Sequence, residues 1–246
     1  MADVRGYFDR KASRVGSSYV ARRWHGTPLR REHYLQTQES VLRAIGGRRF
    51  QRVVEIGAGP CTWTGLLAHR SRSVVAFDLS LEMLKGCSLE FANVARCCGE
   101  ATQLPLRAGT VDAVCSLRAL EYVSDKAAAV AEFHRVLRPG GYLLLVTKNR
   151  TYRGYATRNG DHMEGDPEKA AVHGGTVTAE ELAVVLRGQG FSGLAVGAAV
   201  LGRTRLVLLW TMIRLVRRLF DPASPKGLPW PLDGAVESLL VTAEKS

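Results

Sequence analysis

Three carboxylates in this chain lie at the ends of predicted buried strands, in positions that suit a nucleotide-like ligand. Glu55 stands in an apolar run that leads into two glycines, Gly57 and Gly59. Asp78 ends a second such run, and Glu100 follows a third. Glycine lets the backbone turn sharply and approach a ligand, and an acid at the end of the second strand can bind ribose hydroxyls. Because the ends of parallel strands share one edge of a sheet, these residues predict one binding site at that edge.

The charges around the glycine loop indicate which ligand this is. A dinucleotide places its pyrophosphate on the loop and on the following helix N-terminus, and Glu55 would oppose those negative charges. Thr62 also stands where the dinucleotide fingerprint requires glycine or alanine. S-adenosylmethionine (SAM) has no phosphate and carries an ammonium and a sulfonium, both of which a nearby carboxylate favours. The loop therefore predicts SAM as the cofactor.

The elements that must position these residues lie between about 50 and 150, where short β-branched runs alternate with helical stretches. This alternation is typical of a parallel sheet covered by helices. A helix is predicted over Ser80–Phe91 with Ser80 as its N-cap, and another over Ser124–Leu137, ended by Arg138-Pro139-Gly140-Gly141. The predicted strands are Arg52–Ile56, Ser73–Phe77, Val94–Cys98, Val111–Ser116 and Tyr142–Thr147.

The flanking regions complete a single domain that spans 1–246. Residues 1–49 are polar, arginine-rich and predicted to form a helical cap that ends at Gly46. After the core of 50–150, residues 151–246 are predicted to hold substrate loops, a tail helix and the last strands. In this part Thr178-Ala179-Glu180-Glu181 is a capping box that opens a helix. Leu194–Val200 is a further apolar segment, and Ser238–Glu244 is the predicted final strand.

Composition is that of a globular protein, with 46% apolar and 23% charged residues. The first 25 residues contain six arginines and lysines and no apolar block, so we expect no secretory signal and a cytoplasmic protein. None of the five cysteines forms a C-x-x-C pair, and from this we expect no metal site and no disulfide. The net charge of +11 favours anionic partners, although the arginines are scattered.

The motifs resemble those of class I SAM-dependent methyltransferases, in order and in spacing. Glu55-x-Gly57-x-Gly59 resembles their first motif, and Gly99-Glu100-Ala101, Thr110-Val111-Asp112, Leu120-Glu121-Tyr122 and Leu137-Arg138-Pro139-Gly140-Gly141 resemble those that follow. The resemblance covers roughly 50–150 and is greatest to the group that includes ubiquinone and menaquinone C-methyltransferases and small-molecule or lipid methyltransferases. It implies a Rossmann-like α/β fold with a seven-stranded, mostly parallel sheet and helices on both faces.

The same resemblance implies roles for individual residues. Glu55 would approach the methionine amino group through water, while Gly57 and Gly59 would line the methionine arm. Asp78 would hold the ribose, and Leu79 and Met83 would pack near adenine. An equal alternative for Leu79 and Met83 is that they belong to the hydrophobic core and do not contact the cofactor. Glu100 and the Ala101 backbone would contact the adenine edge, and Leu117 would lie beneath the sulfonium. Three positions depart from the family pattern, namely Cys61, Glu100 and Tyr122, and Cys61 is expected to face the methionine arm.

No catalytic residue is assigned, because methyl transfer from a sulfonium depends mainly on alignment and needs a general base only for some acceptors. The side chains that could act as a base in the segment after the fifth strand are Tyr152, Tyr155, His162 and His173. His134 stands in a predicted helix beside Arg135 and is expected to be structural.

The acceptor is predicted to be a small molecule or lipid-like. Nucleic acid is disfavoured, because Ser116-Leu117-Arg118-Ala119 replaces the Asn/Asp-Pro-Pro-aromatic element of base N-methyltransferases. A protein that keeps the fold without catalysis is a further alternative, opposed by the three carboxylates. Residues 205–220 form a basic amphipathic pattern with Trp210, which suits peripheral contact with a membrane, a lid or a dimer contact. The oligomeric state stays open.

Overall fold

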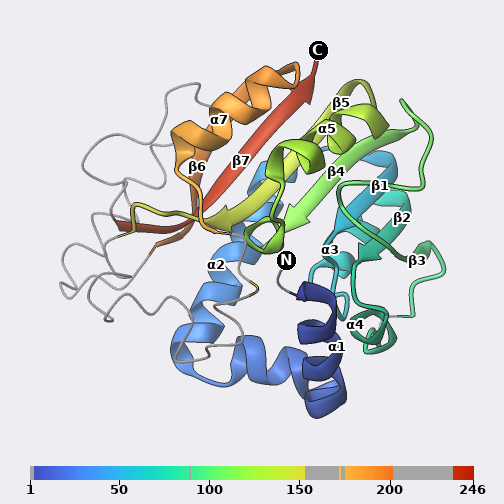
Figure 1. Ribbon diagram of the computed structural model, residues 1–246, viewed down its shortest axis with the longest axis vertical. Coiled ribbons are helices and arrows are strands. Elements are labelled where there is room, and N and C mark those ends of the chain that lie inside the picture. Colours follow the sequence, from blue (N-terminus) through green and yellow to red (C-terminus); the bar gives the residue numbers. More distant parts are fainter. Residues whose placement is uncertain (1–2, 89, 153–171, 173–174, 202–234) are drawn as a thin grey trace.

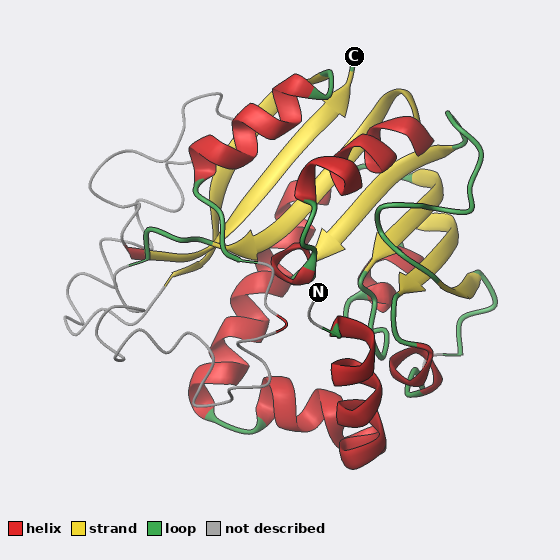
Figure 2. Cartoon of the chain, in the orientation of Figure 1, coloured by secondary structure: helices red, strands yellow, loops and turns green. Residues whose placement is uncertain are grey.

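The computed structural model describes residues 3–88, 90–152, 172, 175–201 and 235–246. A seven-stranded sheet occupies its centre, with helices on both sides (Figures 1 and 2). The strand order is β3-β2-β1-β4-β5-β7-β6, and β7 runs antiparallel to both of its neighbours. The strands are β1 (Phe50–Ile56), β2 (Ser71–Asp78), β3 (Val94–Cys98), β4 (Val111–Leu117), β5 (Leu137–Lys148), β6 (Phe191–Leu201) and β7 (Val236–Lys245).

This sheet confirms the predicted fold class and explains how distant acids reach one edge. The register pairs Val54 of β1 with Val75 of β2 and with Val114 of β4, all in parallel. The ends of β1, β2, β3 and β4 consequently lie along the same edge. Each predicted strand is present, with bounds that differ by a few residues.

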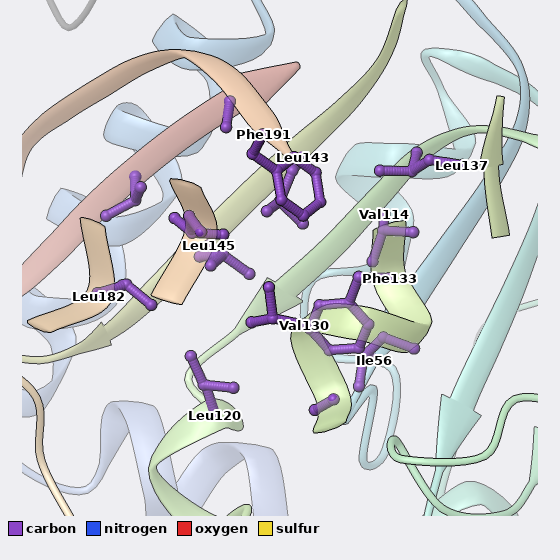
Figure 3. Close-up of a cluster of buried hydrophobic side chains, with 14 of the residues drawn as sticks. Ile56, Val114, Leu120, Val130, Phe133, Leu137, Leu143, Leu145, Leu182 and Phe191 are labelled. Atoms are coloured by element: carbon purple, nitrogen blue, oxygen red, sulfur yellow. The ribbon is translucent and has the colours of Figure 1, made fainter. Parts of the chain in front are cut away.

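Alternate side chains of the strands pack into two cores, as the period of two along a strand requires. One core joins the sheet to α5 (Lys126–Val136) and α7 (Ala179–Gly188), and Figure 3 shows Phe133 and Leu182 of these helices beside strand residues Ile56 and Leu145. The other core joins the opposite face to α2 (Pro28–Ile45) and α3 (Thr64–Ala68). Complete burial of a side chain such as Phe133 stabilises the fold by about 1.5–3 kcal/mol.

Most of residues 3–45 are helical, as predicted. They form α1 (Val4–Val15), η1 (Gly16–Ser18), η2 (Ala21–His25) and α2. Thr27 caps α2 and Pro28 occupies its first turn, while Gly46, with φ +57°, ends it. Figure 1 shows α1 beside α4 (Leu81–Lys85), beyond the carboxyl ends of β1 and β4. The N-terminal helices therefore stand over the edge of the sheet where the predicted site lies.

Two local predictions on this side of the sheet are wrong. The helix expected over Ser80–Phe91 is only α4, which begins after its N-cap Ser80, as predicted, and ends at Gly86. Gly86 accommodates a helix end more readily than its continuation. Cys61 and Cys87 form a disulfide, although no disulfide was expected. They are 26 residues apart in sequence, and the packing of α4 on the glycine loop brings their Cα atoms to 5.2 Å.

Other predictions hold or fall outside the described residues. The capping box at Thr178 is present, with Glu181 completing it. The predicted helix over Ser124–Leu137 is α5, which begins two residues later. The tail segment 205–220 and the side chains of Tyr155, His162 and His173 lie outside the described residues. Within the described part of the chain, no helix is both long and apolar enough to cross a membrane.

Candidate functional site

The glycine loop turns directly out of β1 and needs glycine at its first position. Gly57 has φ +73°, and a Cβ there would lie 2.1 Å from the Cβ of Ala119. The N–H of Gly57 donates to the carbonyl of Phe77 at 2.7 Å, which ties the loop to the end of β2. Gly59 also has a positive φ, of +53°, with no atom in the way of a Cβ. Backbone shape therefore keeps this loop open toward the edge of the sheet.

Asp78, at the end of β2, fixes the loop through its carboxylate. Its Oδ2 accepts the N–H of Gly59 at 2.7 Å, and its Oδ1 accepts the N–H of Ser80 at 2.8 Å. Burial raises the pKa of Asp78, and these two hydrogen bonds partly offset that rise. Each oxygen retains lone-pair capacity, so the carboxylate can still accept hydroxyl donors from a ligand.

Glu55 lies behind the loop and has no contact with solvent. The hydroxyl of Thr64 donates to its Oε2, and its Oε1 has no partner among the described residues. Burial raises the pKa of Glu55 to about 8, an effect that the Thr64 hydrogen bond reduces and the charge of Asp78 increases. A buried acceptor without a partner is costly, so Glu55 favours a donor or a positive charge beside it.

A cavity of about 520 Å³ opens between this edge and the N-terminal helices. That size is in the range of small-molecule sites. Glu55 does not line it. Eight of the nine residues predicted to bind the cofactor do line it, namely Gly57, Gly59, Asp78, Leu79, Met83, Glu100, Ala101 and Leu117.

Cys61 does not face this cavity, contrary to the prediction. Its side chain is buried and points toward Cys87, while its neighbours Pro60 and Thr62 line the cavity. Cys61 has φ +61°, a left-handed conformation that suits the glycine common at this position of the family motif. The direction of the side chain depends on this backbone conformation, which the spacing of the motif did not reveal.

The other half of the cavity comes from residues that the sequence did not predict to bind a ligand, although Tyr122 stands out in it as a departure from the family pattern. Phe8 of α1 and Tyr19 and Arg23, on either side of the start of η2, line it from the N-terminal helices. Arg118 and Tyr122 line it from the turn after β4. Arg118 has φ +66°, a backbone conformation that is uncommon for residues other than glycine and is enriched at functional sites. The available signals were the position of Arg118 directly after a strand and the departure from the family pattern at Tyr122, whereas the N-terminal residues gave none.

Of the four candidate bases, only Tyr152 lies in the described part of the chain, and it does not line this cavity. Tyr152 follows β5 and its N–H donates to the carbonyl of Asn149. The prediction for His134 as a structural residue agrees with its place in α5, where its ring packs edge-on against Phe191 at 5.2 Å. Burial, together with the charge of Lys245, lowers the pKa of His134. Tyr122 is a hydrogen-bond donor rather than a base, because burial raises its pKa.

Comparison with known proteins agrees with this geometry. Residues 54–145 match the model of a methyltransferase domain. Over 125 residues the chain is 38% identical to an uncharacterized methyltransferase of Mycobacterium tuberculosis, covering 50% of this chain and 51% of that protein. A SAM-dependent methyltransferase structure from Thermotoga maritima aligns with a TM-score of 0.68 over 98% of this chain and 99% of the other, at 17% identity, which shows the shared fold.

Residues 54–145 therefore form a methyltransferase domain, and the chain shares the fold of SAM-dependent methyltransferases. It is also 35% identical over 108 residues to a demethylmenaquinone methyltransferase of Beutenbergia cavernae, covering 44% of this chain and 45% of that protein. The chain spans about half the length of the curated relatives it matches. The residues that line the cavity fit SAM, since the open glycine loop and the spare acceptor capacity of the Asp78 carboxylate suit a ligand that carries ribose hydroxyls.

Proposed function

We propose that the chain transfers a methyl group from SAM to a small-molecule or lipid-like acceptor. The observation that supports this most is the two-part cavity, with Asp78 and Glu100 at the ends of β2 and β3 and an aromatic half opposite them. A carboxylate at the end of β2 suits ribose. The aromatic half, which includes Phe8, Tyr19 and Tyr122, suits a partly apolar acceptor.

The chemistry needs alignment more than proton transfer. SAM, when bound, supplies a methyl group on a sulfonium, which is an activated leaving group. The chain would orient the two reactants through Asp78 on one side and the aromatic residues on the other. Orientation of this kind can supply about 7–11 kcal/mol of the acceleration. A phenol such as that of Tyr122, which burial keeps protonated, can donate a hydrogen bond to the acceptor.

A quinone-like acceptor is the finer form of this proposal. It is supported by several relatives named as demethylmenaquinone methyltransferases, which are 32–36% identical to this chain over less than half its length. A lipid-like acceptor would also agree with the basic amphipathic pattern of 205–220, for which we propose peripheral membrane contact. That segment lies outside the described residues, so its support is the sequence pattern alone.

Two experiments in sequence test the function. Isothermal titration should detect binding of SAM and of S-adenosylhomocysteine. A folded protein that binds neither ligand would instead support the alternative of a protein that keeps the fold without catalysis. SAM with a deuterated methyl group should then be incubated with the protein and separate lipid, small-molecule and nucleic-acid fractions of bacterial extract. Mass spectrometry should find the label in the lipid or small-molecule fraction. Label in the nucleic-acid fraction alone would contradict the proposed acceptor class.

A further inference from the structure

Charged side chains of both signs line the cavity, and Asp3 and Arg5 of the N-terminal segment are among them. Asp78 and Glu100 line the part formed by the ends of β2 and β3. Arg23 and Arg118 line the part formed by η2 and the turn after β4. A ligand that fills both parts would meet acceptors for its hydroxyls at one end and positive charge at the other.

The charge of Arg118 is compensated within the protein. Its side chain is only 6% exposed, its Nε lies 3.6 Å from Oε1 of Glu121, and its guanidinium donates to the hydroxyl of Ser238. Buried arginines are generally held by such partners. Arg118 thus contributes to the wall of the cavity with its charge already balanced by Glu121.

The charge of Arg23 is not compensated in this way. Arg23 is partly buried, and no carboxylate forms an ion pair with it in the part of the chain that the structure describes. Its guanidinium carbon lies 4.5 Å from the ring centroid of Trp24, which is itself buried and packs against Trp63 after the glycine loop at 5.1 Å. The packed aromatic rings, with Trp63 edge-on to Trp24, therefore hold the guanidinium in one place without neutralising it.

Two phenols lie near this guanidinium. Burial raises the pKa of Tyr19 and of Tyr122, and the positive charge of Arg23 partly offsets the rise in both. Tyr19, Tyr122 and Arg23 all line the cavity. Together they present a planar, bidentate cation and two hydroxyl donors, which is the donor set that a carboxylate requires.

We propose that Arg23 binds a carboxylate inside the cavity, with Tyr19 and Tyr122 beside it. The proposal rests on the function proposed above and names the chemistry of one of its subsites. Two sources have this chemistry, the methionine carboxylate of the cofactor and an acidic group of the acceptor. A half-buried guanidinium that gains a carboxylate partner forms short charge-assisted hydrogen bonds, so the preference for an anion should be large and specific to this residue.

The first arm of the test compares two ligands that differ in the carboxylate alone. Isothermal titration is done with S-adenosylhomocysteine and with S-adenosyl-3-thiopropylamine, which keeps the ammonium and lacks the carboxylate. If the methionine carboxylate is the partner, Arg23→Gln weakens the binding of S-adenosylhomocysteine by about tenfold to a hundredfold and leaves the affinity for S-adenosyl-3-thiopropylamine unchanged. The affinity of Arg23→Lys for S-adenosylhomocysteine should lie between that of the wild type and that of Arg23→Gln. Arg22→Gln is the matched control, because Arg22 precedes Arg23 in η2 but is exposed and does not line the cavity.

The second arm tests an acidic acceptor, with benzoate and its neutral analogue benzamide titrated into the complex with S-adenosylhomocysteine. If the acceptor supplies the anion, the wild type binds benzoate more tightly than benzamide, and Arg23→Gln removes this preference. The proposal is overturned if Arg23→Gln still binds S-adenosyl-3-thiopropylamine and changes neither the affinity for S-adenosylhomocysteine nor the preference for benzoate over benzamide. A wild type that binds neither adenosyl ligand contradicts the proposed function instead, so the two failures are distinguishable.

Discussion

Replacement of Glu55 by glutamine should remove a pH-dependent loss of stability. Glu55 is fully buried, with one oxygen bonded to Thr64 and the other without a partner among the described residues. Burial raises its pKa from 4.5 to about 8. The folded protein therefore holds this proton more tightly than the unfolded chain does. The resulting stability is fully present below about pH 4.5 and is lost as the pH rises toward 8.

The magnitude follows from the width of this window. One pKa unit corresponds to about 1.4 kcal/mol, so the free energy of unfolding should fall by that amount per pH unit, and by at most about 5 kcal/mol in total. Glutamine has the same shape and no proton to release. The stability of Glu55→Gln relative to the wild type should consequently increase by about 3 kcal/mol between pH 5.5 and pH 8.

Urea denaturation of the ligand-free protein at several pH values measures this difference directly. Glu180→Gln is the matched control, since Glu180 is an exposed residue in the first turn of α7. Comparison with a variant also cancels the contributions of ionisable groups that do not interact with Glu55, such as Lys148, whose pKa burial lowers. A stability difference between wild type and Glu55→Gln that stays constant from pH 5.5 to pH 8 would refute the reasoning.

Three further predictions concern the cofactor, the disulfide and the tail. Asp78→Ala should weaken S-adenosylhomocysteine binding by about 1–3 kcal/mol in isothermal titration, and unchanged affinity in a folded variant would contradict the ribose role. A thiol titration of the denatured protein should find three free thiols without reductant and five after reduction, and five thiols without reductant would exclude the disulfide. Loss of the Cys61–Cys87 disulfide, which spans 26 residues, should lower the free energy of unfolding by about 3 kcal/mol. If 205–220 contacts membranes, the protein should co-sediment with anionic vesicles at low salt and be released at high salt, whereas a protein left in the supernatant at low salt would exclude this contact.

Most of the sheet and one half of the site were predictable from the sequence. Alternating and β-branched runs predicted the five strands of the core, and the glycines of the loop marked the turn after β1. Asp78 and Glu100 could be placed on one edge because parallel strands necessarily share their carboxyl ends. The capping box at Thr178 was equally readable, since its two hydrogen bonds join residues only three apart. These features depend on residues close in sequence or on a general property of parallel sheets.

The tertiary structure alone decided which residues close the cavity and how the loop is held. Arg23 and Tyr19 reach the site because the N-terminal helices pack across the edge of the sheet. Cys61 turns away from the cavity toward Cys87, and Glu55 withdraws behind the loop to Thr64. Hydrophobic periodicity describes which face of an element is buried, but it carries no information on which other element covers that face. Contacts between segments far apart in sequence depend on how whole layers pack, and these contacts set the charge and the shape of the site.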